Sequence, residues 1–336
     1  MPTTYVFGAG ASRHAGYPLA SEMAEGLMDF MLRSGDIQGR AYAEYLMDHF
    51  GRPSNIEDLI TEVQARIDRL KDAETDEEKL EYRRLGTRLA YLGTAVREWF
   101  RQIHVAPAQA YAEFADRIIQ PRDFVITFHY DDSLERELKR AEKWDVSWGY
   151  GFQLGAERNP SNVLILKLHG SINWLVSVFG GATGGSFFVS PGSSSLGERP
   201  VVHQADLNYL GYHDFTGHTY RSGGAFPCLI MPGRSKRFFY DTSFGHEFAD
   251  FWTALWSHAT EAVRRSDQIV VCGYSMLPVD ERACELLLRE PRRDARVSIV
   301  SGSQSERIAA QFSAAGFGNL AGGIGGVLRG LGAAPA

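Results

Sequence analysis

The chain has 336 residues, a formal net charge of −6, and 44% hydrophobic and 12% aromatic residues. This length suits one large domain or two smaller ones, and the apolar content provides for a packed core, which disfavours global disorder. The acidic balance disfavours a protein that coats nucleic acid by itself, because such binding needs a basic surface. The basic cluster at residues 234–237 is interpreted as a solvated loop, with a phosphate or partner contact as the sharper alternative.

Cysteine usage and hydropathy indicate the compartment. The three cysteines, Cys228, Cys272 and Cys284, form no close pair, whereas a structural zinc site takes about four Cys or His ligands, usually in close pairs. We therefore expect no metal, and the odd number of cysteines suits a reducing compartment. No leader-like basic and apolar regions follow Met1, and no apolar run approaches the roughly 18 residues of a membrane span. We expect a cytoplasmic protein without membrane contact.

The first 120 residues combine one strand with a long helical segment. Residues 4–8 predict a buried strand, and apolar residues at helical spacing follow at 19–32, 56–70 and 85–99. Ser54 and Glu57 form a possible capping box before the second of these helices. We interpret the apolar stripes as core packing rather than as a groove for a partner. The sequence therefore predicts an all-helical insertion.

After residue 120, strands alternate with helices. Strands are predicted at 124–128, 163–168, 228–231, 269–272 and 297–300, and helices at 131–143, 248–263, 280–288 and 305–312. This alternation predicts an α/β fold, a Rossmann-like parallel sheet with helices on both faces. The Gly- and Ser-rich segment 179–197 predicts a mobile loop or lid.

These elements predict a division of the chain into three parts. Residues 1–20 and 121–315 form a Rossmann-like nucleotide-binding domain, and residues 21–120 form the helical insertion. Residues 316–336 are rich in Gly and Ala with little to pack, so we expect a poorly ordered tail.

Four predicted strands end in glycine, small polar or ionisable residues. The ends carry Gly8, Ala9 and Gly10 after the first strand, His129 and Asp131 after the second, His169 after the third, and Gly273 and Ser275 after the fourth. In an open parallel sheet, ligands bind outside the carboxyl ends of the strands. The sequence therefore predicts one nucleotide pocket that holds one or two histidines.

The glycines of the first strand end indicate a phosphate contact. Glycine lets backbone N–H groups approach a pyrophosphate closely, although a single G-x-G is a weak signal. The third glycine of the dinucleotide fingerprint would fall at Arg13, and the next strand begins only near residue 124. A nicotinamide-dependent dehydrogenase is therefore disfavoured.

The polar residues at the other ends have a structural and a chemical interpretation. His169 is suited to acid–base chemistry because the unperturbed pKa of histidine lies near neutrality, and a structural hydrogen bond is the alternative. Asp131 either caps the following helix or serves as a pocket carboxylate. Ser275 either binds phosphate or ribose or caps the next turn. Residues 273–275 do not form G-x-S-x-G, so a nucleophile elbow is not supported.

Taken in order, these segments resemble the sirtuin family, in the zinc-less branch found in bacterial antiphage proteins. The resemblance extends from Tyr5 to about Phe312. It rests on residues 8–12 with 16–18, on 55–59, on 127–135, on 167–174 and on 273–275, and the segment 167–174 is the most specific of these.

The resemblance implies an NAD⁺ site and assigns its residues. The family breaks the nicotinamide–ribose bond of NAD⁺, and His169 matches its catalytic histidine. The matched positions for NAD are Gly8, Ala9, Gly10, Ser12, Pro18, Asn173, Gly273, Ser275 and Ser301, and Asp131 matches the pocket aspartate. His129 stands where the family usually has an asparagine that orients the ribose and water. We expect His129 to tune activity, because a protonated imidazole would repel the developing ribose cation.

The implied activity is hydrolysis of NAD⁺ to ADP-ribose and nicotinamide, with NAD as substrate, no metal, and depletion of NAD in antiphage defence. The helical insertion in place of a zinc module favours water over an acyl-peptide as acceptor. The resemblance also implies control by self-assembly or by a partner such as a helicase-type ATPase or an Argonaute-like protein. One alternative is an NAD- or ADP-ribose-binding subunit whose catalysis His129 has blunted, and another is an NAD-dependent protein deacylase.

Overall fold

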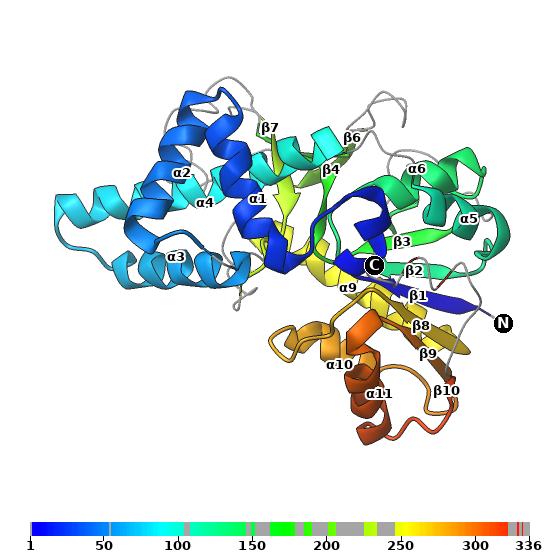
Figure 1. Cartoon of the computed structure of the whole chain (residues 1–336). Helices are drawn as coiled ribbons and strands as arrows, with labels where there is room; N and C mark the ends of the chain where they lie inside the picture. Colours follow the sequence, from blue (N-terminus) through cyan, green and yellow to red (C-terminus); the bar gives the residue numbers. More distant parts are fainter. Residues whose placement is uncertain are drawn as a thin grey trace.

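The fold is built on a parallel β-sheet (Figure 1). The computed structural model describes residues 2–53, 55–103, 108–145, 149–151, 162–178, 185–189, 201–205, 225–233, 246–321, 328 and 331. The six strands of this sheet are β1 (Thr3–Phe7), β2 (Phe124–Thr127), β3 (Leu164–Lys167), β8 (Gln268–Cys272), β9 (Arg296–Val300) and β10 (Leu320–Ala321). Their order is β10-β9-β8-β1-β2-β3, and every neighbouring pair is parallel.

Helices cover both faces of this sheet, as the sequence predicts. One face carries α5 (Gln109–Arg117) and α6 (Ser133–Arg140), and the other carries α9 (His246–Arg265), α10 (Glu281–Arg289) and α11 (Ser305–Ala314). On β1, the rings of Tyr5 and Phe7 pack against Phe114 of α5, with centroids 4.9 and 5.3 Å apart. Thr4 Oγ1 lies 2.7 Å from Ser266 Oγ, just after α9. Because neighbouring strand residues point to opposite faces, these contacts fix the two layers, and the predicted fold class is confirmed.

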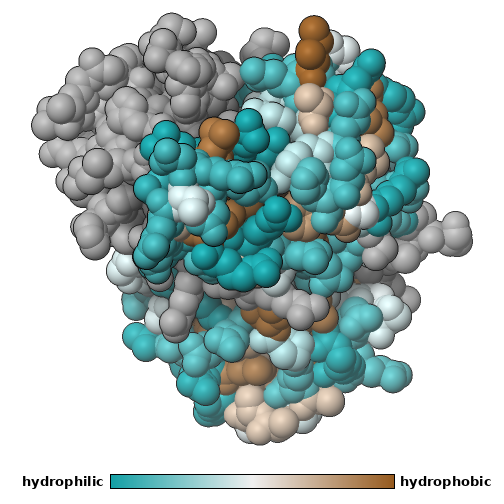
Figure 2. All heavy atoms as spheres, turned by 90° about the vertical axis from the view of Figure 1, so that its left-hand side faces the viewer, coloured by the Kyte–Doolittle hydropathy of each residue, from teal (hydrophilic) through white to brown (hydrophobic). Residues whose placement is uncertain are grey.

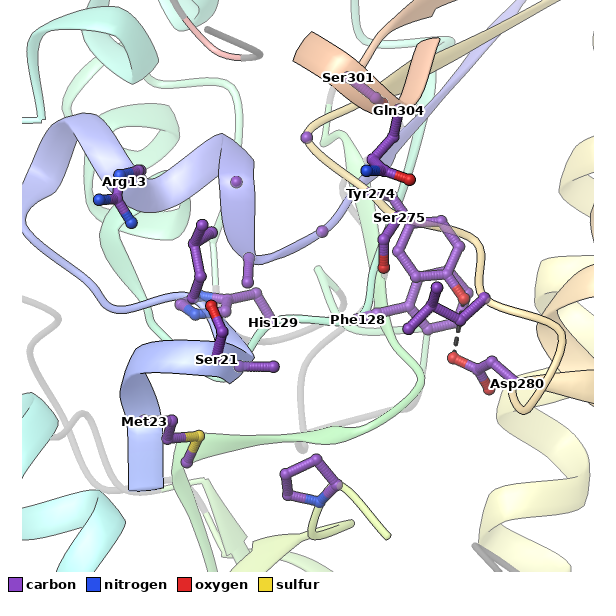
Figure 3. A pocket seen from close by; sticks show the side chains of 18 of the residues that line it. Arg13, Ser21, Met23, Phe128, His129, Tyr274, Ser275, Asp280, Ser301 and Gln304 are labelled. Carbon is purple, nitrogen blue, oxygen red and sulfur yellow. Dashed lines mark hydrogen bonds between the residues drawn. The ribbon is translucent and has the colours of Figure 1, made fainter. Parts of the chain in front are cut away.

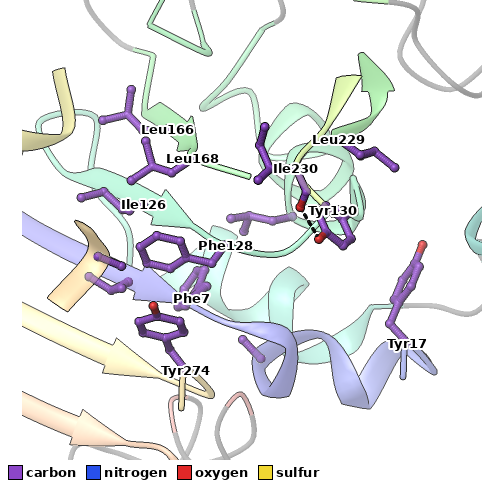
Figure 4. Close-up of a cluster of buried hydrophobic side chains, with 14 of the residues drawn as sticks. Phe7, Tyr17, Ile126, Phe128, Tyr130, Leu166, Leu168, Leu229, Ile230 and Tyr274 are labelled. Atoms are coloured by element: carbon purple, nitrogen blue, oxygen red, sulfur yellow. Dashed lines mark hydrogen bonds between the residues drawn. The ribbon is translucent and has the colours of Figure 1, made fainter. Parts of the chain in front are cut away.

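The strand ends rest on a continuous apolar core. Val6, Ile126, Leu166 and Val271 are fully buried in the middle of their strands. Strands buried on both faces consist of continuous apolar runs rather than alternating ones, which is why they were visible in the sequence. At their carboxyl ends the core continues with aromatic rings such as Phe128 and Tyr274 (Figure 4).

The segment between β1 and β2 is a large helical insertion, as predicted. It contains the short helix η1 (Ala9–Ala15) and the helices α1 (Ala20–Arg33), α2 (Ile37–Phe50), α3 (Ile56–Leu70) and α4 (Asp76–Ile103). The apolar stripe of α3 is buried, and Asn55 caps this helix by accepting a hydrogen bond from the Glu57 N–H at 2.9 Å. The expected cap, Ser54, lies outside the described residues. The face seen in Figure 2 is mainly hydrophilic, with scattered hydrophobic side chains.

A second sheet was not predicted. It is antiparallel, with the order β6-β5-β4-β7, and consists of β4 (Gly170–Val178), β5 (Gly185–Val189), β6 (Val201–Ala205) and β7 (Ala225–Leu229). The interpretation of 179–197 as a loop is wrong for β5, and the rest of that segment lies outside the described residues. The Gly- and Ser-rich flanks hid a short Phe-Phe-Val run with high strand propensity. The basic cluster 234–237 also lies outside the described residues.

The two sheets and the insertion are fastened to one another at the start of β4. Arg97 of α4 donates from Nε to the carbonyl oxygen of Ile172 at 2.9 Å. Ile172 N–H in turn donates to the carbonyl oxygen of Tyr130 at 2.9 Å, close to the end of β2. A hydrogen-bonded path therefore runs from the insertion through β4 to the main sheet.

The parallel sheet also extends further than predicted. Leu320 and Ala321 pair with Val297 and Ser298 of β9, within the segment expected to be a poorly ordered tail. The Val297 N–H donates to the carbonyl oxygen of Asn319 at 3.0 Å. Such edge pairing uses backbone groups alone, so a Gly- and Ala-rich sequence gives little sign of it. After Ala321, only residues 328 and 331 of the tail belong to the described residues.

A buried ion pair joins α6 to β3. Lys167 Nζ lies 2.8 Å from Glu135 Oε1, and both side chains are 1% exposed. The same ammonium donates to the carbonyl oxygen of Asp131, and the Tyr150 hydroxyl donates to Glu135 at 3.2 Å. Burial raises the pKa of Glu135, and the charge of Lys167 opposes that rise. Each charge is therefore stable in the core only while its partner is present.

Lys167→Met should lower the free energy of unfolding by about 3–5 kcal/mol at neutral pH, because Glu135 is left buried without its partner. The pKa of Glu135 is then raised further above its unfolded value, so the loss should grow as the pH rises and shrink as it falls toward the unfolded pKa. Urea unfolding at several pH values measures both effects. The double variant Lys167→Met/Glu135→Leu should recover most of the loss, and a double variant as unstable as the single one would contradict this account.

Candidate active site

A cavity opens where the order of the parallel strands reverses. The chain runs outward from β1 through β2 to β3, then crosses to β8 on the other side of β1 and continues to β9 and β10. Ligands of open α/β sheets bind in the crevice at such a switch point. A cavity of about 450 Å³ lies here, lined by residues that follow β1, β2, β3, β8 and β9 (Figure 3). Its volume falls in the range of small-molecule sites.

Most residues proposed from the sequence line this cavity. They are Gly8, Ala9, Gly10, Pro18, His129, His169, Gly273, Ser275 and Ser301. Ser12, Asp131 and Asn173 do not line it, and all three are buried. Asn173 Nδ2 donates to the Tyr150 hydroxyl at 2.7 Å, on the side of the buried Lys167–Glu135 pair. Ser12, Asp131 and Asn173 can therefore influence the cavity only through the residues that they contact.

Two glycine turns interlock at the floor of the cavity. The Gly8 N–H donates to the carbonyl oxygen of Cys272 at 3.1 Å, and the Gly10 N–H donates to that of Gly273 at 2.9 Å. Gly273 has a φ of +58°, and a Cβ there would lie 2.2 Å from the backbone nitrogen of Ala11. The N–H groups of Gly8 and Gly10 are thus used inside the protein. These glycines serve the close approach of two loops, and the phosphate contact that the sequence suggested stays a prediction.

His129 is held by a buried carboxylate. Its Nδ1 pairs with Asp131 Oδ2, and Ser12 Oγ donates to the same oxygen at 2.6 Å. Asp131 Oδ1 accepts from the Ser133 N–H at 2.9 Å, so this residue also satisfies the first N–H of α6, whose N-cap position is Asp132. Burial would raise the pKa of Asp131, but the interaction with His129, helped by Lys167 and Ser12, holds it well below its ordinary value. Asp131 is therefore ionised and would neutralise a positive charge on His129.

The segment between β1 and β2 supplies the rings that enclose His129. The imidazole stacks on Phe100 of α4 with centroids 5.7 Å apart and an interplanar angle of 30°. Tyr17, between η1 and α1, meets it edge-on at 5.7 Å. The insertion also contributes Met23 and Glu57 to the cavity lining. The site is therefore formed jointly by the sheet and the insertion.

The hydrogen bond at Nδ1 fixes the tautomer of His169. Nδ1 lies 3.2 Å from the carbonyl oxygen of Phe128, which only accepts, so Nδ1 carries the hydrogen. In the neutral imidazole, Nε2 is then a proton acceptor. The backbone is held as well, since the carbonyl oxygen of His169 accepts from the Ile230 N–H at 2.8 Å. His169 therefore presents a basic nitrogen from a fixed ring to the cavity that it lines.

Sequence reasoning missed a polar group opposite His169. Asp280 Oδ2 lies 3.8 Å from His169 Nε2. The same oxygen accepts a hydrogen bond from the Tyr274 hydroxyl at 2.7 Å (Figure 3). The Tyr274 ring stacks on Phe128 with centroids 4.4 Å apart and an interplanar angle of 17°. Asp280 was predicted only as the start of a helix, and no local pattern distinguishes it from an ordinary cap.

Ser301 offers an unsatisfied hydroxyl to the cavity. Its Oγ is buried and has no hydrogen-bond partner among the residues that the structure describes. Buried polar groups are nearly always paired, so an orphan in a cavity wall suits a ligand hydroxyl. Gln304 and Arg13 line the same cavity, and Arg13 forms an ion pair with Glu22 at 2.6 Å.

Neither a metal cluster nor a membrane-spanning helix is present among the described residues. Within the ranges given above, no three His, Cys, Asp or Glu side chains gather in a way that could hold a metal ion. None of the described helices has the length and apolar character needed to cross a bilayer.

No protein-family model and no curated protein matches the sequence. Among solved structures, one reported as a structural basis for the mechanism and regulation of Sir2 enzymes is 14% identical, with 98% of this chain and 90% of that chain covered at a TM-score of 0.38. Sir2Tm bound to a propionylated peptide is 14% identical, with 89% and 80% covered at a TM-score of 0.35. A substituted Sir2 homologue in complex with ADP-ribose is 13% identical, with 93% and 91% covered at a TM-score of 0.35.

Gly273→Ala should destabilise the protein far more than a matched variant elsewhere. A Cβ at this φ costs about 1–2 kcal/mol, and forcing it against the Ala11 backbone adds about 1–3 kcal/mol. The control is Gly35→Ala, where φ is +72° but no atom lies within 4 Å of the added Cβ, so only the first loss applies. Equal urea-unfolding free energies for the two variants would show that the glycine turns are not in close contact.

Proposed function

We propose that the protein hydrolyses NAD⁺ to ADP-ribose and nicotinamide. The observation that carries this proposal is His169, a fixed histidine with a basic Nε2 in a cavity at the topological switch point. His169 also belongs to the segment 167–174, whose resemblance to the sirtuin family is the most specific in the chain. Both lines lead to acid–base chemistry on a nucleotide substrate.

The reaction breaks the bond between the ribose carbon and the nicotinamide nitrogen. The bonding electrons leave with nicotinamide, and the ribose acquires oxocarbenium-like charge in the transition state. Water then forms a new bond to that carbon, and its proton is transferred to a base. His169 Nε2 would take this proton, or that of a ribose hydroxyl, which prepares the attack. The enclosing rings Phe100 and Tyr17 would limit access of bulk water.

The residues along the cavity suit the remaining parts of NAD⁺. The unpartnered Ser301 hydroxyl and the Gln304 amide can bind ribose hydroxyls. Arg13 provides positive charge near the glycine turns, where a pyrophosphate would lie. His129, whose Nδ1 pairs with the Asp131 carboxylate, can orient the nicotinamide ribose by hydrogen bonding, and the negative charge beside it favours the developing cation.

We place this activity in antiphage defence, where depletion of NAD would halt infected cells. Unrestrained hydrolysis would harm the host, so the proposal includes control by assembly of the chain with itself or with a defence partner such as a helicase-type ATPase or an Argonaute-like protein. This setting rests on the resemblance of the residue segments alone.

Incubation of the purified protein with NAD⁺ should release nicotinamide, measured by liquid chromatography, both without and with EDTA. His169→Ala should reduce the rate by about 10²–10⁴-fold because the base is lost. His49→Ala, an exposed histidine on α2, is the matched control and should retain the rate. The assay is repeated with candidate partners, with oligomeric state followed by light scattering.

Other outcomes of that assay would point elsewhere. Release of nicotinamide only in the presence of an acylated peptide would favour the deacylase. Full activity of His169→Ala would remove this residue from catalysis, and dependence on an added divalent ion would contradict a metal-free reaction.

A second candidate function is an NAD- or ADP-ribose-binding subunit with little activity. The pairing of His129 with Asp131 favours it, because the carboxylate occupies Nδ1 and leaves a single nitrogen for a ligand. An asparagine amide both donates and accepts.

His129→Asn should therefore retain or raise the rate of nicotinamide release, since asparagine can donate to Asp131 and still bind a ligand. His129→Ala, which loses the hydrogen bond, is the control and should be slower. A folded but inactive His129→Asn protein would reveal a proton-transfer duty of the histidine. An inactive wild type combined with an active His129→Asn variant would favour the binding subunit.

A further inference from the structure

We propose that Asp280 and Tyr274 position His169 and stabilise its protonated form, so that the three side chains act as one acid–base unit. The unit joins two elements that lie far apart in the sequence, the end of β3 and the loop between β8 and α10. It rests on the proposed function for its kinetic consequences, but its electrostatics can be tested without any substrate.

The carboxylate of Asp280 does not cap the helix at whose start it lies. Asp280 occupies the N-cap position of α10, where an aspartate side chain normally accepts a hydrogen bond from the first helical turn. Here the side chain makes no capping hydrogen bond. Its Oδ2 instead accepts from the Tyr274 hydroxyl at 2.7 Å and lies 3.8 Å from His169 Nε2. The side chain of Asp280 therefore contacts Tyr274 and lies near His169 instead of capping α10.

Tyr274 and the loop around it are held firmly enough to fix that carboxylate. The Tyr274 ring stacks on Phe128, whose own carbonyl oxygen binds His169 Nδ1. The backbone of the loop is clamped by Arg307, which donates to the carbonyl oxygens of Ser275 and, at 3.3 Å, of Met276. The Phe128 ring also meets the His169 ring edge-on with centroids 5.0 Å apart, so Phe128 contacts both the histidine and the tyrosine. His169 and the Tyr274–Asp280 pair are therefore positioned by the same residue, Phe128, which directly follows β2.

The proton balance follows from this geometry. With the hydrogen on Nδ1, neutral His169 has its lone pair on Nε2, and a carboxylate 3.8 Å away favours addition of a proton there. When Nε2 takes a proton from water or from a ribose hydroxyl, the imidazolium forms beside Asp280, and no charge is left uncompensated. The other ionisable groups lining the cavity are Arg13 of η1, Glu57 of α3, and His129 and Tyr130 after β2.

The test combines a titration with kinetics. The imidazole of His169 is followed by NMR on histidine-labelled free protein, with its signal assigned by its loss in His169→Ala. In Asp280→Asn the titration midpoint of His169 should move to lower pH, because the carboxylate that favours the imidazolium is gone. Tyr274→Phe should cause a smaller shift in the same direction. Asp294→Asn is the matched control, since Asp294 is exposed and pairs with Arg292, outside the cavity.

The kinetic arm uses nicotinamide release as a function of pH. Asp280→Asn should lower the plateau of kcat by about 10–100-fold and shift the acidic limb of the profile to lower pH, because a weaker base is also deprotonated at lower pH. Damage to the structure alone would lower the plateau without moving the limb. Circular dichroism verifies folding, and Tyr274→Phe provides the second variant if Asp280→Asn does not fold.

The two arms separate this inference from the proposed function. A shifted His169 titration in a protein that never releases nicotinamide would support the unit and overturn the hydrolase. Active wild-type protein with an unshifted titration and an unmoved acidic limb in Asp280→Asn and Tyr274→Phe would overturn the unit and leave the hydrolase intact.

Discussion

The closure of the two glycine turns between β1 and β8 is the constraint on which the site depends. With Gly10 bonded to Gly273 and no room for a Cβ between them, the loops that follow the two central strands can approach to backbone contact. That contact holds the start of η1 on one side and the Tyr274 loop on the other. Residues of both segments line the cavity, so this backbone contact fixes the relative position of two parts of its wall.

Behind the cavity wall, charge is arranged so that each histidine has its own carboxylate. His129 has Asp131, which Ser12 holds through a hydrogen bond and Lys167 through its charge. His169 faces Asp280, which Tyr274 holds. The two carboxylates come from different elements, the end of β2 and the start of α10. The deeper Lys167–Glu135 pair then compensates the charge on α6, next to Asp131. Two histidines can therefore accept protons in one small cavity without an accumulation of net positive charge.

Features that depend on local sequence patterns were predictable from the sequence, whereas features that depend on contacts between distant segments were not. Buried parallel strands and amphipathic helices have local periodicities, so the main sheet and the helical insertion were predictable from runs such as 269–272 and 56–70. The residues after each strand were predictable as cavity residues for the same reason, and His169 and Ser301 lie there. Asp280 was not predictable, because its partner His169 is brought to it only by the crossing of β3 to β8. The second sheet was missed because Gly- and Ser-rich segments flank the short strand β5, and β10 was missed because it uses backbone pairing alone.

The insertion and the sheet act on the two histidines in different ways. The ring of His129 is enclosed by Phe100 and Tyr17, both contributed by the segment between β1 and β2, and α4 is fastened to β4 by Arg97. His169 is held by hydrogen bonds with the backbone of Phe128 and Ile230, and the ring of Tyr274, in the β8–α10 loop, stacks on Phe128. A displacement of the insertion would therefore disturb His129 first and leave the tautomer of His169 in place.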